Sequence, residues 1–303
     1  MNEAQFIAAL RTLPLHNGAH GLMDDAARLG LLVLTTDTLV EGVHFLSDDP
    51  AADVAWKLVA TTLSDLAAKG ATPLGVLLNY PLSDDSWDGG FLAGFSEALL
   101  AIGGKLLGGD TVALPAGAPR VLSLTAVGEA LDMPWRTGAR SGDALYVTGT
   151  IGDAGPGLAC ARRGAPANAG EAALIEAYRR PVPLLAEGRA LAPHVHAMMD
   201  VSDGLLLDAA RMAQASGLSV TIDLASLPLS AAFRAYAGDD RAARIAAATA
   251  GDDYQLLFAM PHGVPVPVTA HRVGSFGPGS GIALLDGAAF VPLPASLGFQ
   301  HGG

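Results

Sequence analysis

Short apolar runs alternate with longer stretches of helical periodicity along the chain. The apolar runs have the length of strands and are LLVLTT (31–36), LGVLLNY (74–80), RVLSLTAVG (120–128), ALYVTG (144–149), HAMMD (196–200), LSVTID (218–223) and YQLLFAM (254–260). Between them the pattern predicts helices over 52–69, 86–101, 153–163, 171–192 and 204–216. Strands that alternate with helices in this way are typical of an α/β protein.

The rhythm is interrupted once by a run rich in Pro, Gly and Arg, DMPWRTGARSGD at 132–143. Since such composition marks a linker, we place a domain boundary there and divide the chain into 1–135 and 136–303. A second stretch, RRGAPANAG at 162–170, is predicted to be a surface loop.

Composition narrows the classes of partner. The 303 residues carry 30 acids against 18 bases, a formal charge of −12, which argues against nucleic acid because that needs a basic face. It does not exclude phosphorylated small molecules, which acids can hold through a divalent metal. The single cysteine, Cys160, excludes an intramolecular disulfide and is expected to be a buried apolar residue. With no basic leader and no long apolar run, we expect a cytoplasmic protein without a membrane partner.

Acidic residues recur at the predicted ends of elements, next to Gly or Ser. Asp37 and Asp200 each follow an apolar run, and in open α/β sheets the ligand crevice lies outside the carboxyl ends of the strands. Carboxylates that converge there raise one another's pKa values unless cations neutralise them. Magnesium fits this need, because it takes oxygen ligands and substrate phosphates. Thr35 and Thr36 can add backbone or hydroxyl oxygens.

Each of these residues also has a simpler interpretation. The acid pairs at 24–25 and 252–253 can be turn residues. Ser202 is placed to cap the helix that follows it, and Asp203 to meet that helix's dipole, although a helix start also attracts phosphate. His44 can be an ordinary surface or core histidine, and Arg136 a solvated linker residue.

Known nucleotide and hydrolase motifs are absent from the sequence. GGK at 103–105 is followed by leucine where a Walker A loop needs Ser or Thr. The glycine-rich stretches at 152–158 and 277–281 fail the GxGxxG spacing. HExxH, GxSxG and the protein-kinase HRD and DFG motifs are also missing.

Seven motifs nevertheless occur in a specific order: MDDAA, TTDTLVEGVHF, LSDLAAKGATP, GGDT, RTGARSGDALYVTG, DVSDGLLLDAARMA and GDDYQLLF. In this order they resemble bacterial thiamine-monophosphate kinase, a family that shares the fold of aminoimidazole ribonucleotide synthetase. The resemblance runs from about residue 18 to 258. It implies a two-domain fold of mixed sheets packed with helices, with the ligand cleft between an N-terminal metal- and ATP-binding domain and a C-terminal domain that completes the site.

The resemblance also implies an activity, a cofactor and a set of site residues. ATP would donate its γ-phosphoryl group to thiamine monophosphate with several Mg²⁺ ions, in a homodimer built through N-terminal strands. Catalytic roles would fall on Asp37, Asp200 and Arg136, and acceptor contacts on His44, Asp252 and Phe299. Nucleotide contacts would fall on Gly109, Asp110, Arg136 and Ser202. The implied magnesium ligands are Asp25, Thr35, Thr36, Asp37, Asp65, Asp110, Asp200 and Asp203.

The sequence departs from the family pattern in two places. GDDYQL stands where the family usually has GEDYEL, so Asp252 is one methylene shorter and Gln255 is neutral; the residue before the first acid pair is Met23 rather than Gly. Two alternatives to the kinase therefore remain open. One is another ATP-dependent enzyme of the same fold, and the other is a homologue that binds Mg-ATP without turnover.

Overall fold

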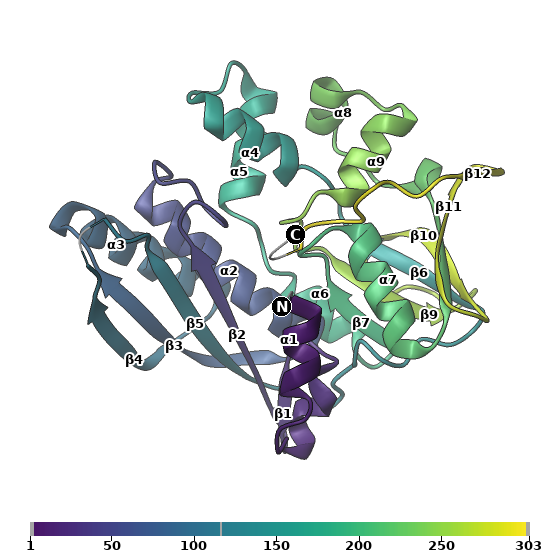
Figure 1. The fold of residues 1–303 in the computed structure, drawn as a ribbon, viewed down its shortest axis with the longest axis horizontal. Coiled ribbons are helices and arrows are strands. Elements are labelled where there is room, and N and C mark those ends of the chain that lie inside the picture. The colour runs from purple at the N-terminus through teal and green to yellow at the C-terminus, as the bar shows by residue number, and fades with distance from the viewer. Residues whose placement is uncertain (1–2, 116, 301–303) are drawn as a thin grey trace.

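The computed structural model describes residues 3–115 and 117–300 and shows two sheets side by side, each with its own helices (Figure 1). The first sheet is formed by the N-terminal part of the chain and the second by the C-terminal part. All seven strands predicted above are present. The mixed sheets packed with helices confirm the predicted fold class.

The first sheet has five strands in the order β1-β2-β5-β3-β4. Helices α2 (Ala51–Ala68) and α3 (Asp85–Ile102) cover one of its faces, where they bury residues such as Val33, Leu122 and Leu124. The opposite face and the outer strand β4 remain exposed. The strands are β1 (Ala27–Leu29), β2 (Leu32–Val40), β3 (Thr72–Leu82), β4 (Leu106–Ala113) and β5 (Val121–Glu129).

The second sheet has seven strands in the order β12-β11-β8-β10-β6-β9-β7. Its main core lies between this sheet and helix α7 (Leu205–Ser216), and includes Leu145, Met212 and Leu257. The strands are β6 (Asp143–Thr148), β7 (Ala197–Asp200), β8 (Ser219–Asp223), β9 (Leu256–Pro261), β10 (Ala270–Gly277), β11 (Gly281–Asp286) and β12 (Ala289–Val291).

The prediction of a single helix over 171–192 is wrong. The structure has α5 (Ala169–Arg179) and α6 (Leu185–Leu191), separated by a non-helical segment that contains Pro181 and Pro183. Proline lacks the N–H that a helix interior needs and disfavours helix in the residue before it, so two prolines in this spacing end the first helix.

Several elements were not predicted from the sequence. Strand β4 lies in a glycine-containing stretch, and β10 to β12 lie in the Pro- and Gly-rich region after 260. The helices that the sequence did not predict are α1 (Glu3–Leu10), η1 (Asn17–Leu22), η2 (Leu224–Ser226), α8 (Ala231–Ala237) and α9 (Arg241–Thr249), whereas α4 (Ala154–Arg163) matches the helix predicted over 153–163.

Helix α2 joins the two halves. Its last turn, at Ala67 and Ala68, packs with Met198 and Phe258 of the second sheet and Leu191 of α6 in one buried cluster. α2 therefore belongs to the first sheet along its length and touches the second at its end. Within the described part of the chain no helix is long and apolar enough to cross a membrane.

Candidate active site

A cavity of about 940 Å³ lies where the two halves meet. Strand β2, helix α2 and the loop before β1 form one wall, and β7, the loop after it and the segment before β9 form the other. Of the predicted site residues it is lined by Asp25, Thr36, Asp37, His44, Asp65, Asp200, Ser202, Asp203, Asp252 and Phe299. Residues more than 250 positions apart in the sequence therefore share one cavity.

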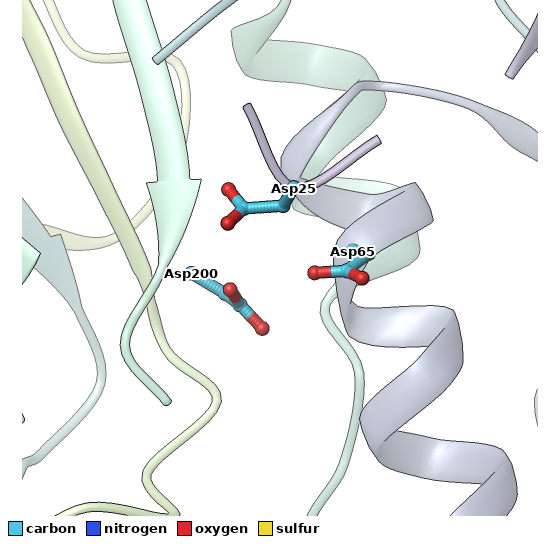
Figure 2. A group of neighbouring side chains, drawn as sticks. All are labelled: Asp25, Asp65 and Asp200. Carbon is cyan, nitrogen blue, oxygen red and sulfur yellow. The ribbon is translucent and has the colours of Figure 1, made fainter. Parts of the chain in front are cut away.

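Three carboxylates meet at one end of the cavity. Asp25 comes from the loop before β1, Asp65 from the last turns of α2, and Asp200 from the end of β7 (Figure 2). One oxygen atom of each lies within 4.8 Å of the others. The three side chains point toward one another from separate elements, so one cation could contact all of them.

Strand β2 adds Asp37 to this cluster and separates the two threonines before it. Side chains alternate along a strand, so Thr35 and Asp37 face α2, where the Thr35 hydroxyl donates to Asp65. The Thr36 hydroxyl instead faces the other side and bonds the carbonyl of Leu124 at 3.3 Å. The Thr36 hydroxyl is therefore engaged away from Asp65.

The closeness of these carboxylates and their burial change their acidity. Burial raises the pKa of Asp37 to about 6, against a hydrogen bond from Thr62 that lowers it. Burial likewise raises the pKa of Asp200 to about 6, although Ser64 donates to it. The pKa of Asp65 is raised well above its usual range, first by burial and then by the charges of Asp37 and Asp200.

The donor set fits a divalent cation with oxygen ligands. Oδ2 of Asp25 is buried without a hydrogen-bond partner among the described residues, and a native structure rarely leaves such an atom unpaired. The surrounding groups are carboxylates and hydroxyls, the ligands that Mg²⁺ takes, and a bound cation would lower the raised pKa values. Asp25, Asp37, Asp65 and Asp200 are therefore the residues that could hold one or more metal ions.

Two cations already lie against this cluster. The guanidinium of Arg136 forms an ion pair with Asp25, and its backbone N–H donates to Asp24 at 2.8 Å. Burial lowers the pKa of Arg136. Behind them the ammonium of Lys69 forms an ion pair with Asp24, and neither side chain is exposed. No pattern in the sequence pointed to a role for Lys69.

The loop after β7 is shaped by Asp208, a residue that was not predicted from the sequence to belong to the site. Its buried carboxylate accepts hydrogen bonds at 3.1 Å from the backbone N–H groups of Ser202 and Asp203. Arg211 bridges Asp208 and Asp203. Burial raises the pKa of Asp208 to about 7.

The prediction of Ser202 as a helix cap is wrong, because Gly204 occupies the N-cap position of α7.

Farther along α2, near Lys57, the other end of the cavity holds His44 and Asp252, two of the three predicted acceptor contacts, while the third, Phe299, lines the cavity beside Asp203. The ring nitrogen Nδ1 of His44 accepts the N–H of Val40 at 3.0 Å, which orients the ring. Asp252 forms an ion pair with Lys57 at 2.7 Å. Phe299 is 44% exposed beside the loop after β7, and its backbone N–H donates a hydrogen bond to the Asp203 carbonyl.

Gly109 and Asp110 lie elsewhere within this chain. Both are on the exposed strand β4, and Asp110 pairs with Asn79, in register with Ser123 and Thr38 on the neighbouring strands. This row lies on the sheet face opposite to Asp37, about three strand spacings or roughly 14 Å across the sheet from β2. A Cβ at Gly109 would lie 1.8 Å from the carbonyl oxygen of Leu78, so the strand accepts only glycine there.

Comparisons with known proteins identify the family of this chain. Residues 23–130 match the family "AIR synthase related protein, N-terminal domain" and residues 140–269 match its C-terminal domain. Thiamine-monophosphate kinase of Caulobacter vibrioides is 38% identical over 95% of this chain and 88% of its own. The enzyme of Escherichia coli K12 is 39% identical over 80% of this chain and 76% of its own.

A solved structure described as AaThiL complexed with AMPPCP and TMP superposes with a TM-score of 0.89 at 29% identity, over 99% of this chain and 97% of the other. The fold and the carboxylate-lined interdomain cavity thus define a member of the AIR synthase related proteins. Within that group the chain belongs to the thiamine-monophosphate kinase family, which confirms the resemblance read from the sequence.

Proposed function

We propose that this protein transfers the γ-phosphoryl group of ATP to thiamine monophosphate and releases thiamine diphosphate and ADP. The observation that carries the proposal is the single cavity in which Asp25, Asp65 and Asp200 converge at one end and His44 and Asp252 lie at the other. Family membership supplies the substrates, because relatives of similar sequence are thiamine-monophosphate kinases and a similar structure is a complex with AMPPCP and TMP.

The chemistry requires two phosphates to be brought together and little else from the protein. The bond from the γ-phosphorus to its bridging oxygen breaks as a bond to an acceptor phosphate oxygen forms. That oxygen is already ionised, so we assign no general base. Bound Mg²⁺ would supply the positive charge that two approaching anions and the equatorial oxygens need.

This chain's own residues would hold and orient the reactants. The carboxylates of Asp25, Asp37, Asp65 and Asp200 would fix the metal ions. The guanidinium of Arg136 lies beside Asp25 and could turn to the transferring group once the metal neutralises that carboxylate. His44, Asp252 and Phe299 are proposed to contact thiamine monophosphate, and Asp203 to join the metal ligands when released from Arg211.

The roles of Gly109 and Asp110 are proposed to depend on a second copy of the chain. Their strand and the sheet face that carries Asp110 are exposed in one chain, together with the apolar side chains of Leu77, Val112 and Val121. A homodimer formed through this face would cover them and would place Asp110 in an interface. The cytoplasmic location, the 135/136 boundary and the absence of nucleic-acid partners stay predictions from the sequence.

One assay tests the proposal directly. Purified protein is mixed with ATP, Mg²⁺ and thiamine monophosphate, and thiamine diphosphate is followed by chromatography, with EDTA and with unphosphorylated thiamine as controls. We expect product that requires both metal and the monophosphate. ATP binding without product would favour a non-catalytic homologue, and turnover with a different acceptor would favour another enzyme of this fold.

A further inference from the structure

Lys57 is a buried lysine aimed at the acceptor end of the cavity. It lies in the second turn of α2, and its side chain is 2% exposed. The ammonium donates to Oδ2 of Asp252 at 2.7 Å and to the carbonyl of His44 at 3.0 Å, and it lies 4.2 Å from the centre of the Tyr178 ring. One cation therefore contacts two of the residues proposed to bind the acceptor.

The carboxylate of Asp252 is held from both sides. Lys57 donates to Oδ2, and the hydroxyl of Tyr254 donates to Oδ1 at 3.0 Å. The backbone there is also constrained, because Asp252 and Tyr254 have left-handed φ angles of 66° and 51°. Such conformations outside glycine persist when the surroundings enforce them and cluster at functional sites.

The same segment is attached to the loop that follows Asp200. The N–H groups of Asp252 and Tyr254 donate at 2.8 Å to the carbonyls of Ser202 and Val201. Lys57 thus connects the first-domain loop at His44 to a second-domain segment that is itself attached next to the carboxylate cluster.

Helix α2 fixes the distance between the two ends of the cavity. Lys57 and Asp65 are eight residues apart on one helix, or about 12 Å at 1.5 Å per residue. Thr61 lies between them and lines the cavity. Since Asp65 is at the carboxylate cluster and Lys57 is at Asp252, this one helix sets the position of the acceptor wall relative to the metal ligands.

We propose that Lys57 is a positioning residue for the acceptor: it fixes the Asp252 carboxylate and the His44 loop at the distance from the carboxylate cluster that the phosphorylated acceptor needs. It acts through Asp252 and makes no contact with ATP. This inference rests on the proposed function, since the acceptor is the one assigned there. The aspartate found at this position reaches both Lys57 and Tyr254.

The kinetic test compares Lys57→Met, Asp252→Asn and the double variant in the full-length protein. We expect Lys57→Met to raise KM for thiamine monophosphate by at least about tenfold, the effect of losing a hydrogen bond to a charged group. KM for ATP should stay within about twofold. The double variant should be no worse than Asp252→Asn, because both changes remove one interaction. Equal changes in both KM values, or additive effects in the double variant, would overturn the proposal.

A matched control separates positioning from stability. Asp143→Asn weakens another contact between side chains that are largely buried, the one at 2.9 Å between Asp143 and Nδ1 of His196, which does not line the cavity. It should lower Tm without changing either KM. Were Lys57→Met to lower Tm in the same way and leave KM unchanged, the role of Lys57 would be merely structural. If Lys57→Met does not fold, Lys57→Arg keeps the charge with a different donor geometry and should still raise KM for the monophosphate alone.

A second readout is independent of activity. The chain has three lysines, Lys57, Lys69 and Lys105, so ¹⁵N-lysine labelling gives few side-chain signals. The signal that disappears in Lys57→Met belongs to Lys57. We expect Asp252→Asn to shift the Lys57 Nζ signal and leave that of Lys69 in place. No shift would overturn the proposal whatever the enzyme's substrate. A shift in a protein that makes no thiamine diphosphate would keep the contact and refute the proposed function and the acceptor role together.

Discussion

Ser64 of α2 donates a hydrogen bond of 2.5 Å from its hydroxyl to Oδ2 of Asp200 at the end of β7. The donor belongs to the first half of the chain and the acceptor to the second, and both groups are buried. A carboxylate of the proposed metal site is therefore held by a residue from the opposite domain, which ties the geometry of the site to the packing of the two halves.

Replacing Ser64 by alanine removes a hydrogen bond that lowers the pKa of Asp200. We expect the half-saturating Mg²⁺ concentration to rise about three- to tenfold near pH 6.5, since protons would then compete more strongly for Asp200, and to rise less at pH 8. Activity measured against Mg²⁺ at both pH values checks this. Ser226→Ala removes a hydroxyl bonded to the Asp223 carbonyl and serves as control. An unchanged Mg²⁺ requirement would contradict the expectation.

Asp37→Asn should separate metal binding from folding. Neutralising one acid of a buried cluster relieves repulsion, so the Tm of the metal-free protein should rise by a few degrees. Turnover should fall by on the order of 10²-fold or more, because the group that would hold the metal is lost. Thermal melts with and without Mg²⁺, together with the kinase assay, test both. Full turnover in a rising Mg²⁺ series would refute the metal role of Asp37.

The carboxylate cluster should make metal-free stability depend on pH. The folded pKa values of Asp37 and Asp200, about 6, lie above their usual value of 3.8. Their contribution to stability is therefore fully present below about pH 4 and is lost as the pH rises through about 6. We expect the free energy of unfolding without metal to decline over this interval because of these groups. The increase in the free energy of unfolding that Mg²⁺ causes should grow over the same interval. If that increase did not depend on pH, the carboxylate cluster would not be the binding site. Asp37→Asn is the control and should flatten the profile.

Replacing only one partner of the buried pair Lys69 and Asp24 should destabilise the protein strongly. Lys69→Met leaves the buried Asp24 carboxylate with backbone hydrogen bonds from Asp25 and Arg136 but without its ammonium partner, which we expect to lower the free energy of unfolding by about 3–5 kcal/mol. Adding Asp24→Asn should restore part of that loss, because the uncompensated charge is gone. Urea melts of the wild type, both single variants and the double variant measure the coupling. Strictly additive losses would show that the pair does not act as a unit.

The proposed dimer can be broken at the exposed face. Val112 on β4 is 49% exposed in one chain, and Val112→Asp would place a charge in the predicted interface. Sedimentation should give a dimer for the wild type and a monomer for this variant. Leu100→Asp changes a side chain that is 83% exposed on α3, on the helical side of the sheet, and should leave the dimer intact. A monomeric wild type would refute the dimer.

The sequence by itself determined seven strands, β2, β3 and β5 to β9, the helices α2, α3, α4 and α7, and the identity of the acids at the ends of elements. Periodicity reports which side of an element is buried, and this local signal suffices for elements such as β2 and α7. The order of motifs also identified the family. Where local signals conflicted, as at Pro181 and Pro183 within an apolar helical pattern, the prediction failed because the prolines outweighed the periodicity.

The tertiary structure decided which of these residues share a site. Thr35 and Thr36 are adjacent in the sequence, yet strand alternation sends only the first hydroxyl to Asp65. The partners Lys57 and Asp252 are 195 positions apart, and a single-sequence pattern holds no information about such a contact. From the sequence alone, a lysine in a helix is expected to be solvated. Whether it is buried depends on what covers the helix, and here the second domain covers it.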